Sequence, residues 1–136
     1  MADISVTAAN VVFSVNAKFY YGTAGATITA GQTVYLDSAT GKYKLGDANA
    51  SAATAAIKGI AAVNCSDGQP IQVGYWDDDF TPGATLTNGT VYVASATAGG
   101  IAPAADLTTG WYPTVLYVAK STTKSVLNLV ASGAVI

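Results

Sequence analysis

Apolar and polar residues alternate with a period of two along much of this chain. In residues 11–20, VVFSVNAKFY, the odd positions are apolar and Ser14, Asn16 and Lys18 lie between them, which is typical of a half-buried strand. Shorter alternating segments, rich in Thr, Val and Tyr, follow at residues 33–37, 42–45, 71–76 and 116–119. The pattern therefore predicts a protein built mainly from β-strands.

Two local signals interrupt the strands. The connection SATG before residue 42 predicts a hairpin over residues 33–45, because Gly41 can take a positive φ. Residues 47–58, DANASAATAAIK, are rich in alanine and begin with Asp47 or Ser51 as a possible N-cap. We expect at most one short helix there.

A phrase near the start of the chain recurs in its second half. GATITAGQTVYLDSAT begins at residue 25 and GATLTNGTVYVASAT at residue 83, and the two align with one residue dropped before the shared Thr-Val-Tyr. Two copies are too few for a solenoid, so we expect an internally duplicated antiparallel β unit whose halves pack in one sandwich or barrel. The expected single domain, 1–136, comprises an N-terminal strand or arm at 1–23, a first β unit at 24–80 and a second at 81–136.

The repeat also bears on a possible modification site. Asn88-Gly89-Thr90 matches a glycosylation acceptor, but Asn-Gly is a strong turn signal as well. The first copy has Ala30-Gly31 at this position and so keeps only the glycine. We therefore expect a turn.

Composition narrows the possible functions. Charged residues make up 10% of the chain, every acid is Asp, every base is Lys, and the net charge is −2. Without arginine and with a negative net charge, the chain lacks the electrostatic footprint of a nucleic-acid-binding protein. Without histidine it lacks the usual catalytic triads and most zinc sites. We expect no enzyme activity, no metal and no cofactor.

The single cysteine and the start of the chain bear on the compartment. Cys65 has no partner for an internal disulfide, and we expect a small buried apolar side chain. The opening residues, MADISVTAAN, show no basic cluster followed by an apolar run, so no signal peptide is expected. No apolar run approaches the roughly 20 residues that span a bilayer. We expect synthesis in the cytosol and no membrane contact.

The densest charge in the chain is the run Asp77-Asp78-Asp79. Three carboxylates could contribute to a site for a hard cation, but the alternating spacing of a calcium loop is missing. The run is better explained as a solvated loop between the two β units.

Large aromatic residues stand next to one another in three places. Neighbours in a strand face opposite sides of the sheet, so at most one of each adjacent pair can enter the same core. The other ring either shields a sheet or strand end, or anchors a protein interface, where Tyr and Trp are enriched. Both interpretations remain open at this point. The adjacent aromatic residues are Phe19, Tyr20 and Tyr21, then Tyr75 and Trp76, then Trp111 and Tyr112.

Three segments together resemble a known family. AGATITAGQTVYLDSATGKYKLGDA, GIAAVNCSDGQPIQV and GATLTNGTVYVASATAGGIAPAADLTTGWYPTVLYVAKS are similar to the head decoration, or cement, proteins of tailed bacteriophages. The resemblance implies an all-β protein, a sandwich or jelly-roll-like barrel, that binds the outside of the capsid and stabilises it without catalysis. It also implies the major capsid protein as partner, a homodimer or homotrimer at symmetry axes, and a virion protein made in the cytoplasm of the bacterial host.

The chain's own aromatic and acidic runs supply the candidate contact residues. A tail or head-fibre component is an alternative function, and so is a carbohydrate-binding β module in which Trp76 or Trp111 stacks on sugar rings. The candidates for an interface are Phe19, Tyr20, Tyr21, Tyr75, Trp76, Asp77, Asp78, Asp79, Phe80, Trp111 and Tyr112.

Overall fold

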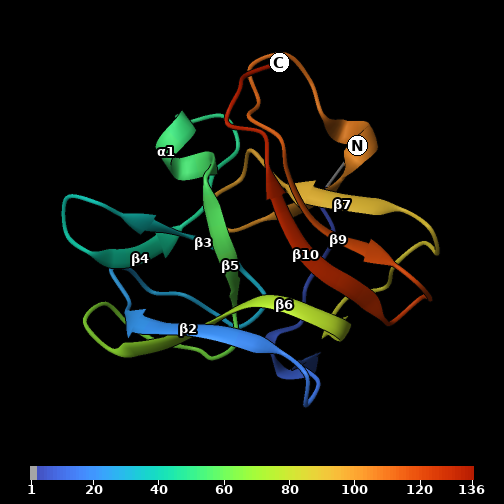
Figure 1. Ribbon diagram of the computed structural model, residues 1–136, viewed down its shortest axis with the longest axis horizontal. Coiled ribbons are helices and arrows are strands. Elements are labelled where there is room, and N and C mark those ends of the chain that lie inside the picture. The colour runs from blue at the N-terminus through green and yellow to red at the C-terminus, as the bar shows by residue number, and fades with distance from the viewer. Residues whose placement is uncertain (1–2) are drawn as a thin grey trace.

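The computed structural model describes residues 3–136, and within them the regular secondary structure is almost entirely β-strand (Figure 1). All pairings between the named strands are antiparallel, and the sheet curls into a half-barrel. The all-β fold with one short helix is thus confirmed. The strands are β1 (Val11–Val12), β2 (Lys18–Thr23), β3 (Thr33–Asp37), β4 (Lys42–Leu45), β5 (Ile57–Ala61), β6 (Pro70–Pro82), β7 (Val91–Ala94), β8 (Ile101–Pro103), β9 (Thr114–Ala119) and β10 (Ser125–Ala131); the helix is α1 (Ala52–Ala55).

Strand pairing divides the sheet into two similar units that share the long strand β6. In the first unit the order is β4, β3, β5, β6 and β2, and in the second it is β8, β7, β9, β10 and β6. The first part of β6 pairs with β2 and β5, and its last part pairs with β10 and β1. The strand pairing places β2 in the first unit and the junction inside β6, whereas the sequence suggested a separate N-terminal strand or arm over 1–23 and a junction after residue 80.

The backbone pairing shows which residues of the two units correspond. In both units the hairpin strands pair with identical relative register, Leu36 opposite Tyr43 in one and Ala94 opposite Ile101 in the other. The amide of Gly31 donates to Ala61 O at 2.9 Å, and the amide of Gly89 donates to Ala119 O at 2.8 Å. The duplication inferred from the repeated phrase is therefore present in the strand pairing.

The residue equivalences given by strand pairing differ by one position from those given by aligning the two repeated sequences. That alignment dropped one residue and matched Tyr35 with Tyr92, but the pairing matches Val34 with Tyr92, because these two residues lie opposite Leu45 and Pro103. The turns before β3 and β7 have equal length, closed by the bonds from Gln32 N to Thr29 O and from Thr90 N to Thr87 O. The dropped residue is thus unnecessary, and the shared Thr-Val-Tyr is one position out of phase.

The local signals correctly identified three features. Gly41 has a φ of 70° in the β3–β4 hairpin, and Gly89 has a φ of 82° in the turn expected at Asn88. Ser51 caps α1: its hydroxyl accepts from Thr54 N at 3.2 Å, while Thr54 Oγ1 accepts from Ser51 N at 3.0 Å. The capping box satisfies amides that a helix of one turn cannot satisfy itself.

The strand expected over residues 11–20 is wrong. The chain instead forms β1 and β2 with a turn between them, closed by the bond from Ala17 N to Ser14 O, and Val15 is fully exposed. Phe13 leaves the strand pattern to pack its ring 4.5 Å from that of Phe80. A contact across the fold thus overrides the local alternation.

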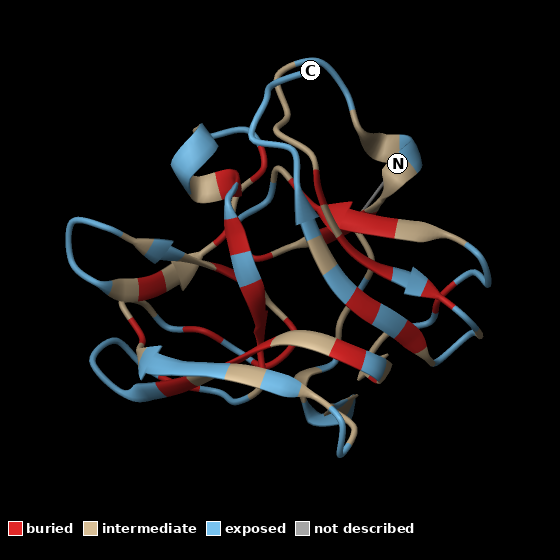
Figure 2. Cartoon of the chain, in the orientation of Figure 1, coloured by how far each residue is buried: buried red, intermediate tan, exposed pale blue. Residues whose placement is uncertain are grey.

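The core forms two clusters, and buried residues occur on strands of both units (Figure 2). One cluster lies within the first unit, and the other combines residues of the second unit with Ala48, Ile57 and Ile60 of the first. In the first unit Ile28, Val34 and Val73 are fully buried, and Cys65 is 7% exposed. In the second unit Phe80 packs edge-on against Tyr117 at 5.6 Å between centroids. Burial of Cys65 is confirmed, and it raises the pKa of the thiol. No helix among residues 3–136 is long and apolar enough to cross a membrane.

Candidate interaction surface

The acidic run is not a loop. Asp77, Asp78 and Asp79 lie within β6, and Asp77 is fully buried. The prediction of a solvated loop is therefore wrong. A carboxylate can occupy a buried strand position when backbone and hydroxyl donors satisfy its oxygens, and the segment around Ser14 supplies these donors.

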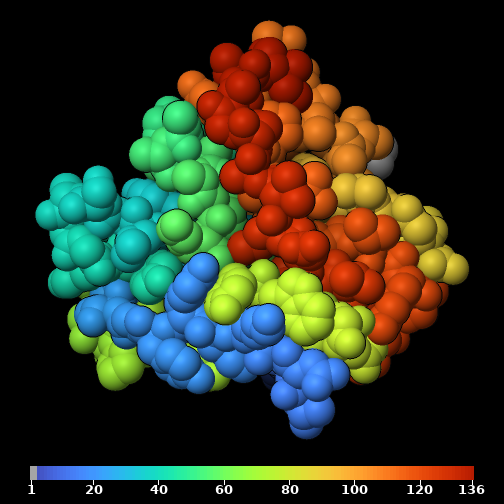
Figure 3. All heavy atoms as spheres, in the orientation of Figure 1, coloured from blue at the N-terminus to red at the C-terminus, as the bar shows by residue number. Residues whose placement is uncertain are grey.

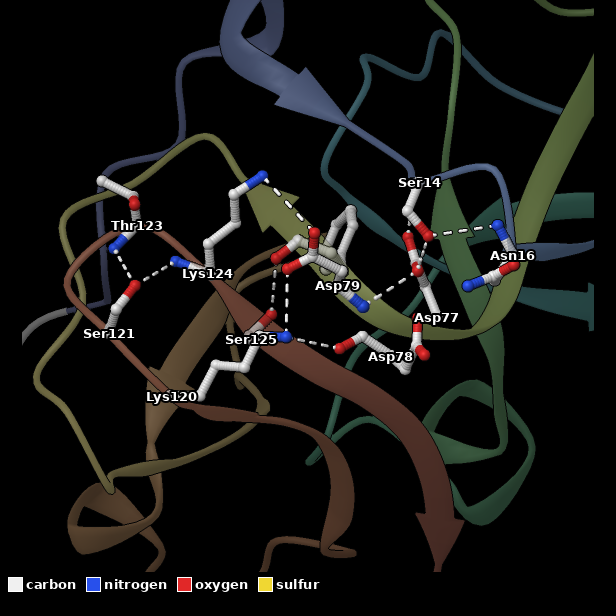
Figure 4. Close-up of polar contacts among 11 residues, drawn as sticks. Ser14, Asn16, Asp77, Asp78, Asp79, Lys120, Ser121, Thr123, Lys124 and Ser125 are labelled. Atoms are coloured by element: carbon white, nitrogen blue, oxygen red, sulfur yellow. Dashed lines mark hydrogen bonds and ion pairs between the residues drawn. The ribbon is translucent and has the colours of Figure 1, made fainter.

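Asp77 holds the turn between β1 and β2 against β6 (Figure 4). Its carboxylate accepts hydrogen bonds from Ser14 N at 2.7 Å, from the Ser14 hydroxyl, and from Asp79 N at 3.0 Å. The Ser14 hydroxyl in turn accepts from Asn16 N at 3.2 Å. The role of Asp77 in this structure is structural, and it offers no surface to a partner.

The other two residues of the run, Asp78 and Asp79, are accessible to solvent, and they make different contacts with lysine side chains. Asp79 pairs with Lys120 at 3.0 Å and lies 4.0 Å from Lys124, and the hydrogen bond from Lys120 lowers the pKa of its carboxyl. Asp78 is exposed, and its backbone carbonyl accepts from Lys120 Nζ at 2.8 Å. Among residues 3–136 there is no group of three or more side chains arranged to hold a metal ion.

Several of the candidate aromatic residues belong to the core or its margin. Phe80 is fully buried, so its assignment to an interface is wrong. Trp111 is half-buried and packs against the core cluster of the second unit. Phe19 is half-buried with its ring 5.1 Å from that of Phe13, and Tyr112 is half-buried beside the C-terminal segment. Tyr21 is the most exposed of these residues, with 74% of its surface accessible to solvent.

Three of the predicted residues, Tyr20, Tyr75 and Trp76, meet in an open depression that we call the aromatic groove. It has a volume of about 340 Å³ and lies where β2, β5, β6 and β10 come together. The space-filling view shows these four strands meeting on one face of the molecule (Figure 3). The groove is lined by Lys18, Tyr20, Ile57, Lys58, Tyr75, Trp76, Asn128 and Leu129.

Strand pairing orders the rings of the groove. Tyr20 lies opposite Val73 in the β2–β6 pair, and a register shift between Lys18 and Phe19 makes Tyr75 an extra residue on β6 that lies next to Tyr20. Their rings stack with centroids 4.2 Å apart and planes inclined by 18°. Lys18 lies opposite Trp76 and places its ammonium 5.3 Å from the Trp76 ring centroid, within cation–π range. The rings are thus held in place before any partner binds.

Positive charge gathers at the groove. Lys18 and Lys58 are exposed, and neither forms an ion pair with another residue of the described chain. The remaining lysines within residues 3–136 each lie within 4.0 Å of an aspartate. The groove therefore has two uncompensated positive charges in a protein whose net charge is −2.

Exposed valines lie on the sheet beside the groove. On β10, Val126 and Val130 are exposed and alternate with buried or half-buried residues, on the face to which the groove residue Asn128 also belongs. Val126 lies opposite the exposed Val118 of β9. Exposed apolar residues grouped in this way are characteristic of protein-binding surfaces.

Sequence reasoning found the aromatic residues of the groove but missed Lys18, Lys58 and Asn128. These three residues come from β2, β5 and β10, which are far apart in sequence. The alternation of β2 and β5 could have indicated that the lysines face solvent, but only the strand order places them side by side.

Comparison of the chain with models of known protein families found no match, and comparison with curated proteins found none either.

Proposed function

We propose that this protein is a structural virion protein that binds the outer surface of a tailed-bacteriophage head and stabilises it. The observation that carries the proposal is the preformed aromatic groove beside exposed valines of the sheet, on a scaffold of small, weakly charged residues. Rings that are already ordered lose little conformational entropy on binding, which favours association with a protein surface. The resemblance of residues 24–48 and 83–121 to head decoration proteins supports the same conclusion.

The mechanism follows from repetition on a lattice. A capsid presents many identical sites, and a protein that binds only the assembled shell stabilises that state by mass action. A modest free energy at each site then sums over the whole particle. No chemical step is needed, so the protein acts by burying surface across contacts between capsid subunits.

Self-association is part of the proposal. Capsid symmetry axes favour closed homo-oligomers, so we propose a homodimer or homotrimer on the shell. The exposed cross-strand pair Val118 and Val126 offers an apolar contact for a second copy. Neither residue lines the aromatic groove, which is therefore left free to contact the shell.

A carbohydrate-binding module is the second candidate, and one observation favours it. Trp76 lines an open groove together with the stacked tyrosine rings, and an aromatic platform of this kind can bind a sugar ring. Against this function, the Lys18 ammonium already occupies the neighbourhood of the Trp76 ring. Trp111 packs against the core, so it is no alternative platform.

Electron cryomicroscopy of heads with and without this protein tests the proposal. We expect added density on the outer surface at many symmetry-related positions and a higher temperature of head disruption when the protein is bound. A few copies confined to the tail or to a single fibre would support the fibre component instead. Heads that neither bind the protein nor gain stability would refute the proposal.

A further inference from the structure

The aromatic groove lies among exposed apolar residues and contains two lysines without an acidic partner in the described chain. We infer that it receives an acidic segment of the capsid protein, an extended strand or loop that carries a carboxylate next to an apolar side chain. This inference rests on the function proposed above and specifies the partner at that site.

Charge complementarity determines the sign of the charge that the occupant of the groove carries. Lys18 and Lys58 both line the groove, so an approaching carboxylate is attracted by two positively charged residues. The rest of the chain is acidic on balance: the whole chain has a net charge of −2, so the residues other than these two lysines carry −4. An acidic partner is therefore attracted to the groove and repelled elsewhere, which both steers and orients the encounter.

The lining of the groove determines the rest of its chemistry. Ile57 is buried and Leu129 half-buried, so they give the groove an apolar part suited to an apolar side chain. Asn128 is exposed on β10, and its amide can donate to and accept from a peptide backbone. A volume of about 340 Å³ admits a short stretch of extended chain and excludes a folded domain.

A second copy of this chain fits the groove poorly. A symmetric contact centred on the groove would place Lys18 and Lys58 of one molecule against the same lysines of the other, and the like charges would repel. An acidic sugar would leave the apolar part of the groove, formed by Ile57 and Leu129, without an apolar partner, whereas an apolar side chain of a peptide would cover it.

The test measures binding to heads of the encoding phage from which this protein has been removed. The variant Lys18→Glu/Lys58→Glu reverses both charges of the groove. The control Lys42→Glu/Lys124→Glu changes the net charge equally but alters two lysines that do not line the groove and whose ion-pair distances, 3.8 and 4.0 Å, are long. We expect the groove variant to bind at least about tenfold more weakly than wild type and the control to bind within about threefold. A third variant, Tyr20→Ser, removes one stacked ring without reversing charge, and we expect weaker binding whose salt dependence is unchanged.

The outcomes separate this inference from the proposed function. If wild type binds heads and the groove variant binds as well, the function stands and the inference is wrong. Equal losses in the groove variant and the control would indicate general charge attraction and would also overturn it. If wild type does not bind heads, the proposed function fails and the inference fails with it. Retention of wild type on immobilised polygalacturonate, lost in the groove variant while head binding persists, would assign the groove to an acidic polysaccharide and overturn the peptide occupant.

Discussion

Replacing Asp77 with alanine should destabilise the protein far more than replacing its neighbour Asp78. The Asp77 carboxylate is fully buried and accepts from Ser14 N, the Ser14 hydroxyl and Asp79 N. Net contributions of about 1 kcal/mol per bond, with a further cost for amides left without an acceptor, give a loss of about 3 kcal/mol. For a chain of 136 residues this corresponds to a fall of about 10 °C in the thermal midpoint.

Urea unfolding followed by circular dichroism measures the loss directly. Asp78→Ala is the matched control, because that side chain is exposed and its contact with Lys120 uses the backbone carbonyl. We expect the control to cost about 0.5 kcal/mol or less. Ser14→Ala removes the hydroxyl that donates to Asp77 and accepts from Asn16 N but keeps the bond from Ser14 N, and it should cost about 1 kcal/mol, with clear coupling to Asp77→Ala in a double-mutant cycle. Equal stabilities of the Asp77 and Asp78 variants would refute the assignment of Asp77 as the residue that fixes the β1–β2 turn.

Three further predictions concern the thiol, one ion pair and one glycine. Cys65 should react slowly with iodoacetamide in the folded protein and rapidly in urea, because burial raises the pKa of its thiol; rapid reaction of the folded protein would contradict its burial. Because Lys120 lowers the pKa of Asp79, the ion pair contributes its full stabilisation at pH values above the ordinary carboxyl pKa of 3.8. This stabilisation is lost as the pH falls through the lower pKa that Asp79 has in the folded protein. The thermal midpoint of Asp79→Asn should therefore lie below that of wild type at pH 6 and converge with it in strong acid, and a constant difference would refute the pairing. Gly74→Ala should cost about 1–3 kcal/mol in urea unfolding, since its Cβ would lie 2.0 Å from Phe13 Cε2; an unchanged midpoint would mean that Phe13 moves aside freely.

The features that the sequence predicted correctly are determined by neighbouring residues. The β3–β4 hairpin follows from Gly41, and α1 begins directly after Ser51, the N-cap, because Thr54 completes the capping box. The turn at Gly89 needs only a residue that tolerates a positive φ. Each of these signals depends on residues that are close together in the sequence, so it can be recognised from the sequence alone.

The features that the sequence missed depend on distant contacts. The strand expected over residues 11–20 breaks because Ser14 binds Asp77, a residue 63 positions away. The same bond explains why an acidic run, which normally favours a loop, can lie within β6. The groove combines residues of four strands, and neither periodicity nor composition reveals that Lys18, Lys58 and Trp76 become neighbours.

The shared strand β6 makes the duplicated protein a single mechanical unit. In the first unit its residues 70–76 pair with β2, and in the second its residues 76–80 pair with β10, so no flexible linker separates the two halves. A cut within β6 would divide the strand that both units share, and it would also divide a core cluster that joins Ile57 and Ile60 of the first unit to Phe80 and Leu127 of the second. Neither half is therefore expected to be stable as a separate fragment. The two halves should therefore unfold in one transition, and a load on either half would pass to the other through continuous, hydrogen-bonded backbone.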